Sequence, residues 1–191
     1  MRWPLALALA ATCLVASACG SSTGPSGSTG TFSMMLKDSP FTDAKSLLVT
    51  FSEVDAHKSD TADGTWTKLP FAGGATSRTC DLKKLETAQD VLGTGPLTTG
   101  HYTQVRLVVS AAVIYFDNAA TDACAATIAP PAGRNANVTI PSGEVKLNRE
   151  FDVSSATTTT MLLDFDGDKS VRDTGNGQYM MSPVIAVVSV Q

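Results

Sequence analysis

The clearest strand signal in the sequence is the stretch HYTQVRLVVS, His101–Ser110. Its large apolar side chains are those of Tyr102, Val105, Leu107 and Val109. Successive side chains of a strand point to opposite faces of a sheet, so Val105 and Leu107 predict one buried face. Arg106 lies between them and is expected on the other face, paired there with an acidic side chain. The segment Val113–Asp117 is expected to continue this strand or to pair with it.

The turn that enters this strand has its own signature, LTTGHY at Leu97–Tyr102. Gly100 permits a positive φ, which other residues adopt only with strain. Tyr102 follows at the strand entrance, where a tyrosine hydroxyl can bond back to the backbone and fix a sandwich corner. We therefore expect Gly100 and Tyr102 to be structural residues.

The chain from Thr31 to Gln191 continues in the same manner. It is rich in Thr, Val and Ser, and turn signals recur about every 8–12 residues. The segment 93–100 is expected to be a loop, and 81–91 to hold one short helical turn. The other strand candidates are 31–37, 46–57, 66–69, 124–128, 137–140, 144–147, 150–153, 158–165 and 184–190. Roughly nine or ten short strands predict an all-β fold, an antiparallel β-sandwich of immunoglobulin or transthyretin-like type.

The first residues are typical of a secretion signal. A positively charged start precedes the apolar run Leu5–Val15, which is shorter than the ~20 residues that span a membrane. The next residues, Ala16-Ser17-Ala18-Cys19-Gly20, resemble a bacterial lipobox, in which the cysteine is lipidated and becomes the new amino terminus. We therefore expect 1–18 to be a lipoprotein signal peptide and Cys19 to carry lipid. An ordinary cut after Ala18, without lipid, is the alternative.

A tether follows the predicted anchor. Gly20–Gly30 consists of Ser, Gly and Thr with one Pro, a composition typical of flexible linkers. We divide the mature chain into a lipidated cysteine with its tether, 19–30, and a β-sandwich domain, 31–191. The domain is expected in the cell envelope, held to a membrane by its lipid and facing the periplasm or the exterior. Gly20 rather than Asp after Cys19 favours the outer membrane in a Gram-negative organism.

Two cysteines, Cys80 and Cys124, lie in the expected domain. A compartment outside the cytoplasm permits disulfides, and we predict one between these two residues. Two separate buried thiols are the alternative. Two cysteines and two distant histidines are too few ligands for a zinc site.

Charge and motifs narrow the function classes. The chain has 14 Lys and Arg against 18 Asp and Glu, a formal net charge of −4. Domains that bind nucleic acid are basic, so we expect no nucleic-acid partner. The expected domain, 31–191, contains no Gly-x-Ser-x-Gly, His-Glu-x-x-His, phosphate-loop or dinucleotide-binding motif. We therefore expect no catalytic residue and no enzyme activity.

The best candidate for site chemistry is the acidic segment DFDGD, Asp164–Asp168. Neighbouring carboxylates repel unless a cation or a basic side chain lies between them, and calcium is one such cation. The candidate ligands are Asp164, Asp166 and Asp168, with Asp38, Asp43 or Asp173 added if the fold brings them near. The simpler interpretation is a solvated strand end, where Asp168 caps a turn and Lys169 or Arg172 neutralises charge. No cofactor other than this calcium is expected, and a carboxylate-based hydrolase is a third hypothesis for the same residues.

Short motifs along the chain, taken in order, resemble a known family. They are LKDSP at Leu36–Pro40, Trp66, Asp81-Leu82, GHYTQVRL at Gly100–Leu107, IPSG at Ile140–Gly143, LDFD at Leu163–Asp166 with Ser170-Val171, Tyr179 and SPVI at Ser182–Ile185. This order is similar to that of the bacterial lipoprotein family called domain of unknown function 4382, over about Phe32 to Val190. The resemblance implies a secreted or surface lipoprotein with a β-sandwich. It implies no established activity and no catalytic residue.

The function favoured by these observations is that of a cell-envelope lipoprotein with a non-catalytic β-sandwich for binding or structure. Its ligand would be a glycan, peptidoglycan or another envelope protein. Trp66 is expected in the core, which weakens the glycan hypothesis because glycan sites use exposed aromatic rings. His57 and His101 are expected on the surface or rim, at strand ends. The alternative function is a calcium-dependent adhesion module that uses the segment Asp164–Asp168.

Overall fold

The computed structural model describes residues 27–39, 44–59 and 65–191. The predicted signal peptide, Cys19 and most of the tether lie outside the described residues, as does Asp63-Gly64, a dipeptide that predicts a hairpin turn. No helix among the described residues is long and apolar enough to cross a membrane. The buried apolar residues of the main core run from Phe32 to Ile185, so the chain after Cys19 contains the whole core of the described fold.

The described part of the chain forms thirteen strands and two one-turn α-helices. The strands are β1 (Thr29–Ser39), β2 (Ser46–Lys58), β3 (Thr65–Lys68), β4 (Arg78–Asp81), β5 (Asp90–Thr98), β6 (Gly100–Tyr115), β7 (Cys124–Ala125), β8 (Asn135–Thr139), β9 (Glu144–Val153), β10 (Thr158–Asp166), β11 (Val171–Gly175), β12 (Gln178–Met181) and β13 (Ile185–Val190). The helices are α1 (Leu82–Leu85) and α2 (Gly167–Ser170). The all-β prediction is confirmed, as is the helical turn at α1.

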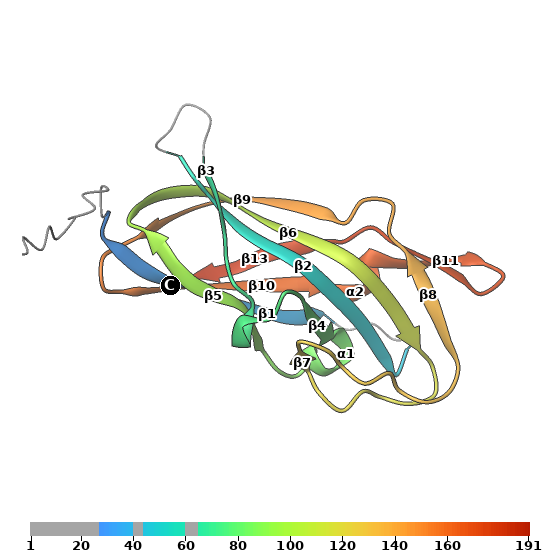
Figure 1. The fold of residues 1–191 in the computed structure, drawn as a ribbon. Helices are drawn as coiled ribbons and strands as arrows, with labels where there is room; N and C mark the ends of the chain where they lie inside the picture. The colour runs from blue at the N-terminus through green and yellow to red at the C-terminus, as the bar shows by residue number, and fades with distance from the viewer. Residues whose placement is uncertain (1–26, 40–43, 60–64) are drawn as a thin grey trace, which may run out of the picture.

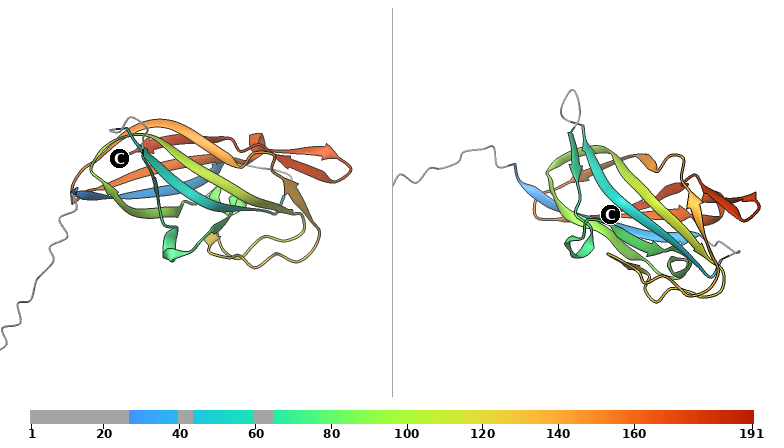
Figure 2. Two further views of the ribbon diagram at one scale, coloured as in Figure 1. Left: turned by 45° about the horizontal axis from the view of Figure 1, so that its top comes forward. Right: turned by 45° about the vertical axis from the view of Figure 1, so that its right-hand side comes forward.

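The strands form two sheets that enclose the core (Figures 1 and 2). The smaller sheet has the order β13-β10-β1-β5. The larger has nine strands, with the path β11-β12-β8-β6-β2-β4-β7, while β3 also pairs with β2 and β9 with β6. Long alternating strands explain this architecture, because each buries one face. In β1, for example, Phe32, Met34 and Leu36 are fully buried.

The sheets are mixed, which departs from the purely antiparallel sandwich expected. β1 pairs in parallel with β10, from Thr31 opposite Thr158 to Ser39 opposite Asp166. β12 pairs in parallel with β8. The carboxyl ends of β1 and β10 therefore lie side by side at the same end of the smaller sheet. Strand pairing across such distances in the sequence cannot be deduced from the pattern of a single strand.

One expected loop is a strand. The dipeptide Gly95-Pro96 predicts a loop over 93–100, yet most of this segment belongs to β5, whose Leu92 and Leu97 are buried. β5 is an edge strand of its sheet, where proline is tolerated. A Cβ on Gly95 would lie 2.7 Å from Cδ of Pro70. A glycine is therefore needed at this position because the backbone of β5 passes close to Pro70, and not because the chain turns there.

Other boundaries also differ from the sequence-based expectations. β6 runs without interruption from Gly100 to Tyr115, and β9 joins two segments that were expected as separate strands. β4 and the hairpin of β11 and β12 were not expected as strands. These missed strands have four or five residues each, too few for a clear alternation of apolar and polar residues.

The turn into β6 has the predicted tyrosine corner. The Tyr102 hydroxyl donates to the carbonyl of Thr98 at 2.8 Å, and Gly100 has a φ of 141°. The Tyr102 ring is fully buried and stacks on Phe151 at 5.2 Å between ring centroids. Phe151 in turn stacks on Phe32 of the smaller sheet at 4.9 Å. The corner residue therefore joins the turn to the contact between the two sheets.

The predicted disulfide is present. Cys80 of β4 and Cys124 of β7 are directly opposite in the antiparallel pair and are bonded through sulfur. The bond holds the segment after β6 against the larger sheet. That segment covers a small second core cluster of Leu48, Tyr115, Ala120 and Ile128.

Candidate functional site

The outward side of four neighbouring strands carries an ordered polar surface. Val105 and Leu107 of β6 are fully buried, so Gln104 and Arg106 lie on the opposite side of the sheet. The strands β3, β2 and β9 contribute the residues paired with them. We call this surface the outer face, consisting of Glu53, Asp55, His57, Trp66, Lys68, Gln104, Arg106, Glu144, Lys146 and Asn148.

Four side chains on the outer face form one straight row. Trp66 of β3 is opposite His57 of β2, His57 is opposite Gln104 of β6, and Gln104 is opposite Asn148 of β9. The His57 and Trp66 rings are 4.8 Å apart between centroids, and Gln104 Nε2 donates to Asn148 Oδ1 at 2.8 Å. We call these four residues the planar row, because each ends in a flat aromatic, imidazole or amide group.

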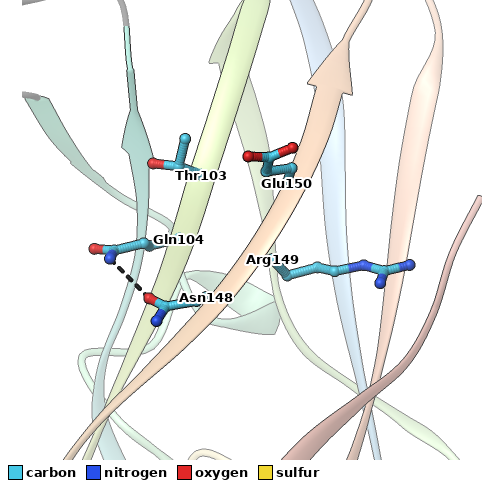
Figure 3. A pocket seen from close by; sticks show the side chains of 5 residues that line it. All are labelled: Thr103, Gln104, Asn148, Arg149 and Glu150. Carbon is cyan, nitrogen blue, oxygen red and sulfur yellow. Dashed lines mark hydrogen bonds between the residues drawn. The ribbon is translucent and has the colours of Figure 1, made fainter.

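A hollow opens at the Asn148 end of the planar row (Figure 3). The pairing of β6 with β9 shifts register between Tyr102 and Gln104, so the two strands are locally irregular. The hollow that results has a volume of about 660 Å³ and is open to solvent. Its lining residues are Thr103, Gln104, Asn148, Arg149 and Glu150. Thr103 also hydrogen-bonds His57 Nδ1 at 3.1 Å, which links the hollow to the planar row.

Arg106 is the centre of the charges beside the planar row. Its guanidinium donates to Asp55 Oδ2 from Nε at 2.9 Å and from Nη2 at 2.7 Å. Glu53 and Glu144 lie at 3.9 and 3.8 Å, and the guanidinium carbon lies 4.7 Å from the centre of the Trp66 ring. The bond to Asp55 raises the pKa of Arg106 above its ordinary value. The expected position of Arg106, on the opposite face with an acidic partner, is confirmed.

Trp66 was expected in the core, and that expectation is wrong. It lies on the outer face, partly exposed, between His57 and the guanidinium of Arg106. A strand of four residues has no long alternation that would tell which side is buried. His57 is half-buried in the planar row, whereas His101 is exposed and pairs with Asp152 at 2.9 Å. Sequence reasoning therefore missed the planar row, although it singled out two of its members, His57 and Trp66.

The acidic segment lies elsewhere, at the carboxyl ends of β1 and β10. Asp164 is opposite Lys37 and pairs with its Nζ at 3.0 Å. Asp166 accepts from the backbone N–H of Lys169 at 3.0 Å and from its Nζ at 2.6 Å, and so caps α2. These bonds lower the pKa of Asp166. Lys169 thus has the neutralising role that the simpler interpretation gave to it or to Arg172.

Asp38 is the buried acid of this region. Its side chain is 4% exposed; Oδ1 accepts from the N–H of Gly167 at 3.0 Å, and Oδ2 has no hydrogen-bond partner among the described residues. Burial, the largest cause, raises its pKa to about 8, and the carboxylates of Glu86 and Asp164 act in the same direction. Asp38 was considered only as an extra calcium ligand. Asp43, another such candidate, lies outside the described residues.

The described residues contain no group of three His, Cys, Asp or Glu side chains placed to hold a metal ion. The calcium hypothesis remains a prediction that can be measured. Asp164 and Asp166 already pair with lysines. We therefore expect the mature chain to have the same melting temperature in ~1 mM calcium as in EDTA. A ligand that did bind, at a hundredfold excess over its Kd, would raise the free energy of unfolding by about 2.7 kcal/mol.

The matched variant for this measurement is Asp166→Ala. It removes the cap of α2 and should lower stability by about 1 kcal/mol to the same extent with and without calcium. A rise of several degrees in calcium that disappears in Asp166→Ala would contradict our expectation and establish the site.

Comparison with known proteins gives one result. A family model described as a domain of unknown function (DUF4382) matches residues 29–183. The matched range begins at the first residue of β1 and includes the whole outer face and the acidic segment. No curated protein and no solved structure matches the chain significantly.

Proposed function

The chain belongs to the DUF4382 family, and from that premise we propose that it is a cell-envelope lipoprotein whose β-sandwich is a non-catalytic binding module. Cys19 is the lipidated residue in this proposal, and the Ser- and Gly-rich residues after it are the tether. The sequence Ala16-Ser17-Ala18-Cys19 and the composition of the tether support the anchor. In a Gram-negative cell, Gly20 favours the outer membrane.

The observation that carries the binding function is the planar row on the outer face. Tryptophan is a preferred anchor residue of binding surfaces, where it supplies a large contact area and one hydrogen-bond donor. Trp66 lies partly exposed on a strand, and ion pairs hold its neighbours in place. Residues fixed on strands present a ligand with a rigid surface, so little entropy is lost on binding.

The position of the row also fits an anchored module. Ser28 Oγ and Thr99 Oγ1 form a hydrogen bond of 2.9 Å, so the chain enters the domain beside the turn into β6. Gln104 lies only a few residues further along β6. The planar row is therefore at the tethered end of the sandwich. A linker such as 19–28 reaches ~16–19 Å root-mean-square, which keeps this end close to the membrane surface.

Binding to the cell envelope tests the proposal. The mature chain from Gly20 onward, without lipid, is mixed with isolated envelopes of its own organism and sedimented. We expect Trp66→Ala to lower the affinity at least about tenfold, because truncation of an anchor residue costs about 2 kcal/mol or more. Trp66→Phe should retain most of the binding, since it keeps an aromatic ring. An affinity equal for all three proteins would refute the outer face as the binding surface.

A further inference from the structure

We propose that the planar row binds a neutral oligosaccharide laid across the strands, from Trp66 to the hollow beside Asn148. This inference rests on the proposed function and names the class of its ligand. It depends on three properties of the outer face: the length of the row, the hydrogen-bonding groups in it and the balance of charge around it.

The length of the row fits a short glycan chain. Trp66 and Asn148 are three strand spacings apart, which is ~14 Å at ~4.8 Å per spacing. A chain of three pyranose rings is comparable in length with these three spacings. Each sugar of a trisaccharide would therefore lie over one or two side chains of the row.

The hydrogen-bonding groups fit hydroxyls. His57 bonds Thr103 through Nδ1, and Gln104 bonds Asn148 through Nε2. Within the described part of the chain, His57 Nε2, Gln104 Oε1 and Asn148 Nδ2 form no hydrogen bond with another protein group and are left to solvent or ligand. The row thus offers both donors and acceptors, and a sugar hydroxyl can serve as either. Trp66 adds an apolar ring and an N–H at the far end of the row.

The charges on the outer face favour a neutral ligand. Three carboxylates, those of Glu53, Asp55 and Glu144, are matched by the three cations of Lys68, Arg106 and Lys146. Each cation lies within 4.0 Å of at least one of these carboxylates. A surface neutralised in this way exerts little long-range attraction on a polyanion or a polycation. It can still orient the dipoles of a hydroxyl-rich chain.

The hollow gives the glycan a defined end. It lies directly beside Gln104 and Asn148, and its wall includes the exposed Glu150 as well as Thr103 (Figure 3). Its volume of about 660 Å³ is large enough to receive a terminal sugar with its substituents. The other side of β9 carries no part of this surface, since Phe151 points into the core.

Calorimetric titration of the mature chain with glucose and N-acetylglucosamine oligomers of one to six units tests the inference. We expect binding by one of the two series, with an affinity that rises up to about three units and then levels off. Trp66→Ala and the pair Gln104→Ala with Asn148→Ala should each weaken binding at least about tenfold. Between ~50 and ~500 mM NaCl the affinity should change less than about twofold, since no net charge is paired.

Val188→Ala is the control, because Val188 is half exposed on β13 of the smaller sheet; it should bind as the parent does. No binding by either series at millimolar concentration, equal binding by Trp66→Ala, or a steep dependence on salt would each overturn the inference. If envelopes still bind the parent and not Trp66→Ala while no oligomer binds, the ligand class is wrong and the proposed function stands. If Trp66→Ala also leaves envelope binding unchanged, both the ligand class and the proposed function are refuted.

Discussion

Replacing Cys80 and Cys124 together by alanine is expected to lower the free energy of unfolding by about 4 kcal/mol. The two residues are 44 positions apart in the sequence, and the bond removes the freedom of that loop from the unfolded chain. The folded chain should also loosen locally. β7 has only two residues, and without the bond its hydrogen-bonded support is its pairing with β4 and the bond from the Asp81 N–H to the Ala123 carbonyl.

Urea unfolding of the mature chain and of the double variant measures this effect. Reduction of the parent by a thiol should reproduce the loss seen in the variant, since both remove the same bond. Limited proteolysis should cut the variant between residues 116 and 134, where the chain covers Leu48 and Tyr115. A loss smaller than about 1 kcal/mol would show that the loop is not constrained by this bond.

Stability is expected to fall as the pH rises from 5 to 8, because of Asp38. The folded-state pKa of this acid is about 8, against an ordinary value of 3.8. Between these two values the folded chain retains a proton that the unfolded chain releases, so the contribution of Asp38 to stability declines with rising pH. The decline is about 1.4 kcal/mol for each pH unit, or on the order of 4 kcal/mol over this range.

The variant Asp38→Asn isolates the contribution of Asp38 to the pH dependence of stability. An asparagine can accept from the Gly167 N–H as Asp38 Oδ1 does, and it carries no ionisable proton. We expect the variant to gain stability relative to the parent as the pH rises, by on the order of 4 kcal/mol between pH 5 and 8. Asp173→Asn is the control, since Asp173 is exposed on β11. A gap between Asp38→Asn and the parent that does not change with pH would contradict the assignment.

The parts of the fold that could be predicted are those with a long local signal. The sixteen residues of β6 contain enough alternation to fix its buried face and the position of Arg106. Gly100 and Tyr102 predicted the corner because few residues other than glycine adopt a positive φ, and because a buried tyrosine hydroxyl needs a hydrogen-bond partner nearby. The parallel pairing of β1 with β10 had no such signal, because it joins segments that are far apart in the sequence.

The candidate site was harder to predict, for a similar reason. Trp66, His57, Gln104 and Asn148 come from four strands, and only the register of those strands places them in a row. The acidic segment was visible because its three aspartates are close in sequence, yet the structure gives two of them lysine partners. The sequence identifies Asp38 only as a possible extra calcium ligand, near the carboxyl end of β1. Its hydrogen-bond donor, the N–H of Gly167 in α2, lies 129 positions away in the sequence.

The central claim is that the outer face binds a component of the envelope. The most direct measurement is the affinity of the mature chain for isolated envelopes, compared between the parent and the variants Trp66→Ala and Val188→Ala. The account predicts a loss of at least about tenfold for Trp66→Ala and no change for Val188→Ala. Equal affinities for the two variants and the parent would contradict it.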